Sequence, residues 1–73
     1  MKFNHSELAR LLEIRDGQNL STLTKKKVTA DLRLFGFITV EGEKLSLTGR
    51  LMTAGVCRIT ATGRAALERF KPS

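Results

Sequence analysis

The sequence predicts one small α+β domain spanning residues 1–73, with two N-terminal helices, an antiparallel ribbon of strands and a C-terminal helix. Three observations support this prediction. A chain of 73 residues can build only one hydrophobic core. Its composition, with 41% hydrophobic and 27% charged residues, is typical of a globular protein. The spacing of apolar residues changes from helical in the first half to alternating in the second.

The first predicted helix covers residues 5–15. Asn4 and Glu7 have the spacing of a capping box, in which each side chain accepts a hydrogen bond from the other residue's backbone amide. Apolar residues at positions 8, 11, 12 and 14 give the segment one apolar side. Gly17 supplies the left-handed conformation that commonly ends a helix.

The second predicted helix covers residues 21–35, after a short connection at 17–20. Ser21 is expected to cap it, and Gly36 to end it. At 100° per residue, Val28, Leu32 and Phe35 share one side. The opposite side is expected to collect small, polar and cationic residues, namely Thr22, Lys26, Thr29, Ala30 and Arg33.

Alternating apolar and polar residues then predict an antiparallel ribbon. Strands are expected at 37–41 and 44–48, joined by a tight turn at Glu41-Gly42-Glu43, with a third strand at 56–60. Residues 49–55 are expected to form a loop or a strand extension. A last helix is expected at 61–70, where Thr60 is the cap and Ala66, Leu67 and Phe70 turn inward.

This order of elements, and two stretches within it, resemble the winged helix-turn-helix superfamily of small bacterial and phage regulators. The stretch SELARLLEI, followed after a turn by TKKKVTADLRLFGFI, is similar to the helix pair whose second helix leads into the wing. The stretch CRITATGRAALERF is similar to the strand and helix that follow the wing. The resemblance implies a compact winged helix-turn-helix fold with a two- or three-stranded wing.

The superfamily normally places a further helix before the pair, and only residues 1–3 precede the first helix here. The C-terminal helix or a partner subunit would therefore have to cover the exposed surface. Leu20, Leu23 and Leu34 lie on a flank of the second helix and could form such a contact. We therefore expect a homodimer as one alternative.

Thirteen Lys and Arg residues against seven Asp and Glu give a net charge of +6, which favours a polyanion as the partner. Nucleic acid is the first candidate. An anionic membrane is the weaker one, because no apolar run approaches the roughly 20 residues of a spanning helix, and the N-terminus lacks the apolar stretch of a secretory signal. We expect a cytoplasmic protein.

The predicted function is binding of double-stranded DNA, as in a bacterial or phage transcriptional regulator. Lys and Arg side chains would replace counterions at phosphates, while small residues on the second helix would let the backbone approach base edges. Acidic residues flank Gly42, so the contact made by the ribbon is expected nearer Arg50. The expected DNA-binding residues are Thr22, Lys25, Lys26, Lys27, Thr29, Ala30, Arg33, Lys44, Arg50 and Arg58.

No catalytic or metal-binding pattern stands out, and no cofactor is expected. Cys57 is the only cysteine and His5 the only histidine, so one chain cannot assemble a zinc cage from them. Cys57 is expected in the core. The sequence contains no paired carboxylates on one face and no glycine-rich phosphate loop.

Two other interpretations remain open. The run of lysines at 25–27 is also typical of a solvated helix face. The same fold can serve as a protein-binding module or a phage-type inhibitor that docks on a host protein, because a fold does not determine one function.

Overall fold

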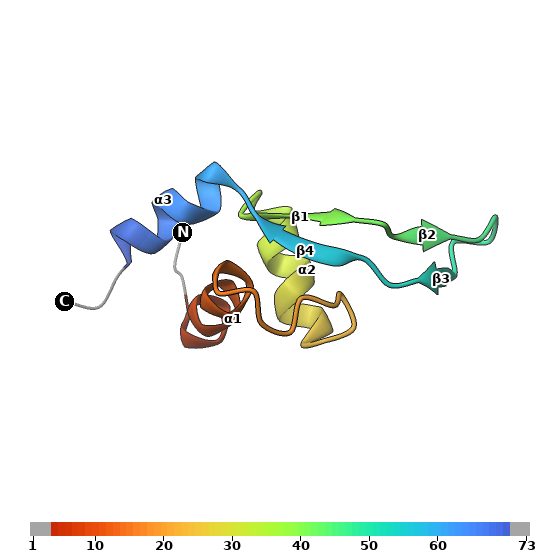
Figure 1. Ribbon diagram of the computed structural model, residues 1–73, viewed down its shortest axis with the longest axis horizontal. Helices are drawn as coiled ribbons and strands as arrows, with labels where there is room; N and C mark the ends of the chain where they lie inside the picture. Colours follow the sequence, from red (N-terminus) through yellow and green to blue (C-terminus); the bar gives the residue numbers. More distant parts are fainter. Residues whose placement is uncertain (1–3, 71–73) are drawn as a thin grey trace.

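A computed structural model describes residues 4–70 as an α+β domain, as the sequence predicts (Figure 1). The helices are α1 (His5–Arg15), α2 (Lys26–Leu34) and α3 (Ala61–Arg69). The strands are β1 (Ile38–Glu41), β2 (Lys44–Leu45), β3 (Leu51–Thr53) and β4 (Val56–Ile59). Strand β1 pairs with β4 and β2 with β3, both antiparallel.

Helix α1 has the predicted bounds, and its capping box is present. The Asn4 side chain accepts from the Glu7 amide at 2.8 Å, and the Glu7 carboxylate accepts from the Asn4 amide at 3.1 Å. Both contacts are local, so residues three positions apart are enough to fix where the helix begins.

Helix α2 is shorter than predicted: it begins at Lys26, and Ser21 does not cap it. Ser21 instead forms an isolated bridge with Val56 of β4. The Thr22 amide donates to the carbonyl of Gly55 at 3.1 Å, and its hydroxyl accepts from the Gly55 amide at 3.1 Å. Contacts with a segment over 30 residues away thus keep positions 21 and 22 out of the helix, and the predicted short link between the helices becomes a longer connection.

The strands also pair differently from the prediction. The chain runs out along β1 and β2, reverses at residues 46–50 and returns along β3 and β4 (Figure 1). Residues 42–55, called the arm below, extend beyond the helices, and the molecule measures 45 × 23 × 19 Å. The predicted turn at Gly42 is wrong.

A hydrogen-bonded loop explains why the reversal lies at the far end of the arm. The Gly49 amide donates to the Ser46 carbonyl at 3.0 Å, and the Arg50 amide donates to the Ser46 hydroxyl at 3.1 Å. Gly49 has a φ of 84°, a conformation open to glycine at little cost. Gly42 also has a positive φ, of 78°, but it lies between β1 and β2 on the outgoing half of the arm.

The core lies where α1, α2 and α3 meet the base of the ribbon. Helix α3 packs against α1, while contact with a partner subunit stays a prediction. Thr60 caps α3 by accepting from the Gly63 amide at 3.0 Å, as predicted, although Phe70 is 38% exposed and does not turn fully inward. The buried apolar residues are Leu11, Ile14, Leu32, Phe37, Ile38, Cys57, Ala66 and Leu67.

Cys57 belongs to this core, as the sequence predicts. Its side chain is almost fully buried, and burial raises the pKa of its thiol above the usual value. A buried neutral thiol is a poor nucleophile, so Cys57 has a packing role.

Candidate nucleic-acid interface

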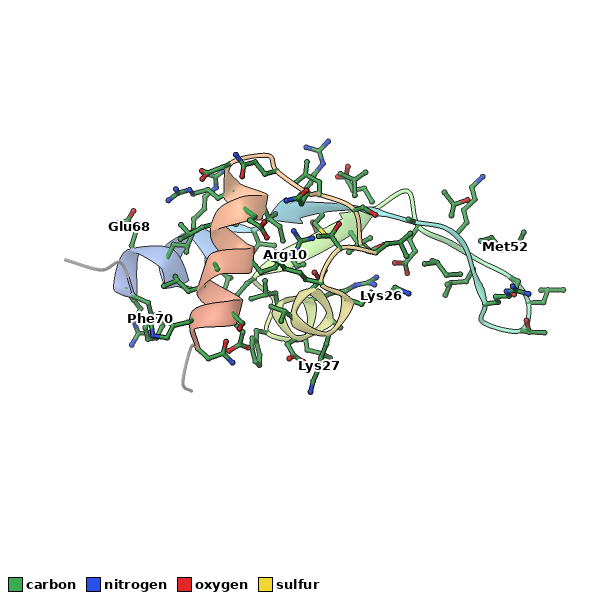
Figure 2. All side chains as sticks on the ribbon, turned by 90° about the horizontal axis from the view of Figure 1, so that it is seen from below. Arg10, Lys26, Lys27, Met52, Glu68 and Phe70 are labelled. Atoms are coloured by element: carbon green, nitrogen blue, oxygen red, sulfur yellow. The ribbon has the colours of Figure 1, made fainter. Side chains whose placement is uncertain are left out.

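One side of α2 carries exposed residues of the predicted interface. Lys26, Ala30 and Arg33 are spaced at i, i+4 and i+7, and all three are exposed. Lys26 extends from the helix on the side of the arm, whereas Lys27 points away from the body (Figure 2). The sequence therefore predicted correctly that this line of α2 is open to solvent.

Helix α2 and the arm enclose a groove of about 550 Å³. Its lining is largely apolar, and Lys26, Arg33 and Glu43 supply its charges. Leu23 and Leu34, which line it, are 52% and 83% exposed, so the leucines expected on the flank of the second helix are open here. Leu20 instead packs against the core. The lining residues are Thr22, Leu23, Lys26, Thr29, Ala30, Arg33, Leu34, Val40, Glu43 and Leu51.

Thr29 is not available to a partner. It is 3% exposed, and its hydroxyl accepts from Arg10 and donates to the carbonyl of Thr24. The structure therefore does not present Thr29 for the predicted DNA contact, because α1 covers the edge of α2 on which it lies. Thr22 is half-buried and its hydroxyl is occupied by the Gly55 amide, so the structure does not present it as a DNA contact either.

Arg10 is the buried residue that sets α2 in place, and sequence reasoning missed it. Its guanidinium donates to the Thr29 hydroxyl at 2.8 Å, to the Asn19 carbonyl at 2.6 Å and to the Ser21 carbonyl at 3.2 Å. These bonds join α1, the connection and α2, and Arg10 lies between the two helices (Figure 2). The sequence does contain a pattern that indicates this burial: the spacing of Arg10 from Leu11 and Ile14 places it on the apolar side of α1.

Three of the predicted cations have carboxylate partners. Lys25 pairs with Glu13 at 3.0 Å, Arg33 with Glu43 at 3.4 Å and Arg58 with Glu41 at 2.7 Å. The hydrogen bond from Lys25 also lowers the pKa of Glu13. The cations are all about half exposed or more, and surface pairs of this kind stabilise a fold by only about 0 to 1 kcal/mol. A phosphate can therefore compete with each carboxylate.

Four predicted cations are exposed and take part in none of the ion pairs recorded for residues 4–70. Two lie on α2, at Lys26 and Lys27, and two on the arm, at Lys44 and Arg50. Arg50 lies in the loop at the far end of the arm, where the sequence placed the outer contact. These side chains can bind an anion without first leaving a carboxylate.

Arg58 lies apart from the groove. It lines a separate hollow of about 310 Å³ together with Arg15 and Arg64, between α1, β4 and α3. The predicted cations thus lie on two surfaces. All but one surround α2 and the arm, and Arg58 alone lies on the other surface.

Among residues 4–70, no group of three His, Cys, Asp or Glu side chains is placed to hold a metal ion. Within the same range, no helix has the length and apolar character to cross a membrane.

No protein family model, no curated protein and no solved structure matches this chain.

Proposed function

We propose that this chain is a double-stranded DNA-binding protein of winged helix-turn-helix type, in which α2 is the recognition helix and the arm is the wing. The observation that supports the proposal most strongly is the exposed line of Lys26, Ala30 and Arg33 on α2, beside an arm with Lys44 and Arg50. The role we propose is transcriptional regulation in the cytoplasm of a bacterium or for a phage.

The dimensions suit this mode of binding. An α-helix with its side chains is about 10 to 12 Å across and fits a major groove about 12 Å wide. The longest dimension of the molecule, 45 Å, exceeds one helical turn of B-DNA, about 34 Å. Helix α2 can therefore occupy the major groove while the arm reaches a neighbouring groove or the backbone.

Each of the three side chains in the exposed line on α2 has a distinct role in this proposal. Lys26 neutralises a phosphate, and it can do so directly because it has no carboxylate partner among the described residues. Ala30 is small enough to bring the helix backbone close to the bases and to contact a thymine methyl group. Arg33 exchanges Glu43 for the two acceptors of a guanine or for a phosphate.

The proposal is tested by measuring duplex affinity as a function of salt. Duplexes are first selected from random DNA near physiological salt, and binding is then followed by fluorescence anisotropy. Lys26→Ala is expected to lower the slope of log K against log salt by about one unit, because one fewer counterion is released. Arg64→Ala, a change of equal charge on α3, is expected to leave the slope unchanged. Equal slopes for the two variants would contradict the assignment of α2.

A second candidate function is that of a protein-binding module. The groove between α2 and the arm favours it, because its lining is largely apolar and includes the exposed Leu23 and Leu34. Exposed apolar patches commonly mark protein-binding surfaces. Weak duplex binding that depends neither on sequence nor on Lys26 would favour this candidate over DNA.

A further inference from the structure

The loop at the end of the arm carries an exposed leucine, Leu47, and is held in shape by hydrogen bonds between its own residues. Leu47 is fully exposed. On either side of it, the hydroxyls of Ser46 and Thr48 are hydrogen-bonded to each other at 2.9 Å. The Ser46 amide donates to the Arg50 carbonyl at 2.8 Å, in addition to the two bonds that Gly49 and Arg50 donate to Ser46. The polar groups around Leu47 are thus occupied within the loop, and this fixed loop carries an exposed Leu47 side chain.

The exposed side chain of Leu47 does not stabilise the fold. Leu45 and Met52 on the same arm are also exposed, at 59% and 72%, and Met52 lies well out along the arm (Figure 2). Apolar surface at the end of a projecting ribbon adds nothing to the core. A loop whose backbone is fixed before binding loses little freedom on binding, so this arrangement favours contact with a partner.

The charge around Leu47 indicates the chemistry of that partner. The segment from Lys44 to Leu67 contains no Asp or Glu, and its arm portion carries Lys44 and Arg50. The partner must therefore combine negative charge with an apolar gap that admits one side chain. A DNA minor groove has both, since its phosphates attract Arg and Lys and its stacked base pairs can be opened by an inserted Leu or Met.

We propose that Leu47 is a wedge that inserts between two base pairs from the minor groove and bends the DNA, with Arg50 holding the arm in the groove. This inference rests on the proposed DNA-binding function and adds DNA bending to it. Leu47 lies at the narrow end of the ribbon, and this shape suits a base step better than a membrane surface, where binding strengthens with the apolar area that is buried.

The experiment measures the end-to-end distance of a selected duplex of about 30 base pairs by energy transfer between its labelled ends. Wild-type protein and Leu47→Met are expected to bring the ends closer, because Met keeps the apolar volume of the wedge. Leu47→Ala is expected to bind with about tenfold lower affinity and to leave the duplex straight. The thermal unfolding of Leu47→Ala should match wild type, since Leu47 buries no surface in the fold.

The outcomes separate the two proposals. If Leu47→Ala binds and bends the duplex as wild type does, the wedge is wrong and DNA binding stands. If wild-type protein binds no duplex, both proposals are wrong. Two further measurements would reassign the loop and overturn the wedge: loss of binding to phosphatidylserine vesicles in Leu47→Ala, or loss of a dimer in sedimentation of the same variant.

Discussion

Arg10→Ala is expected to be the most destabilising single change in this protein. It leaves the buried Thr29 hydroxyl and the half-buried hydrogen bonds to the Asn19 and Ser21 carbonyls without their donor, and it opens a cavity between α1 and α2. Each buried polar group left unsatisfied costs about 1 to 3 kcal/mol. Small domains are stable by only about 5 kcal/mol or a little more. Urea denaturation followed by circular dichroism should therefore show a variant that is largely unfolded at 25 °C.

Two further variants separate the hydrogen bonds of Arg10 from its volume. Arg10→Met keeps most of the packing and is still expected to lose about 2 kcal/mol, because the three oxygens remain without a donor. Arg15→Ala removes an exposed arginine from the same helix and should change stability by less than about 0.5 kcal/mol. Wild-type stability in Arg10→Met would contradict the role assigned to the buried guanidinium.

Gly63→Ala is expected to have the second largest effect. A Cβ atom at Gly63 would overlap the carbonyl oxygen of Phe37 and lie 3.0 Å from the Ile59 side chain. The Phe37 carbonyl has little freedom to move, because it accepts from the Thr60 amide at 3.0 Å. Overpacking of this kind typically costs about 1 to 3 kcal/mol and here acts against fixed backbone, so we expect a net loss of about 2 kcal/mol or more.

Gly63→Ala is expected to lower the stability of the protein, whereas helix propensity alone predicts that it raises it. Alanine is favoured over glycine inside a helix by about 1 kcal/mol. Ala65→Gly, an exposed position in the same helix, measures that propensity with no steric term. If thermal unfolding finds Gly63→Ala less destabilised than Ala65→Gly, the close approach of α3 to the Phe37 carbonyl is contradicted.

The sequence predicted those parts of the fold that local contacts determine. Helix α1 has the predicted bounds because Asn4 and Glu7 cap it from within, and α3 begins as predicted because Thr60 caps it. The start of α2 was wrong because hydrogen bonds between Thr22 and Gly55 override the helical spacing of residues 21–25. Nothing in the residues near Thr22 indicates that contact.

The reversal of the chain was misplaced for a related reason. Glu41-Gly42-Glu43 and Thr48-Gly49-Arg50 are both plausible turns, since each has glycine between polar residues. Only the second has Ser46 positioned to bond the loop closed. The pairing of β1 with β4 then follows, because the ribbon is longer than the first turn would allow.

For the candidate site, helical spacing identified which residues of α2 are exposed but not what they contact. Lys26, Ala30 and Arg33 lie as predicted, whereas Thr29 is covered because Arg10 of α1 bonds to it. The pairing of Arg33 with Glu43 depends on where the base of the arm lies relative to α2, which spacing along the chain does not reveal.

Chemical-shift mapping of the ¹⁵N-labelled protein titrated with the selected duplex tests the DNA-binding account most directly. The largest changes are expected at the amides of Lys26, Ala30 and Arg33 on α2 and of residues 47–50 on the arm. Changes confined to the surface of Arg15, Arg58 and Arg64, or no changes at a duplex concentration that saturates binding, would contradict the assignment of α2 and the arm as the DNA-binding surface.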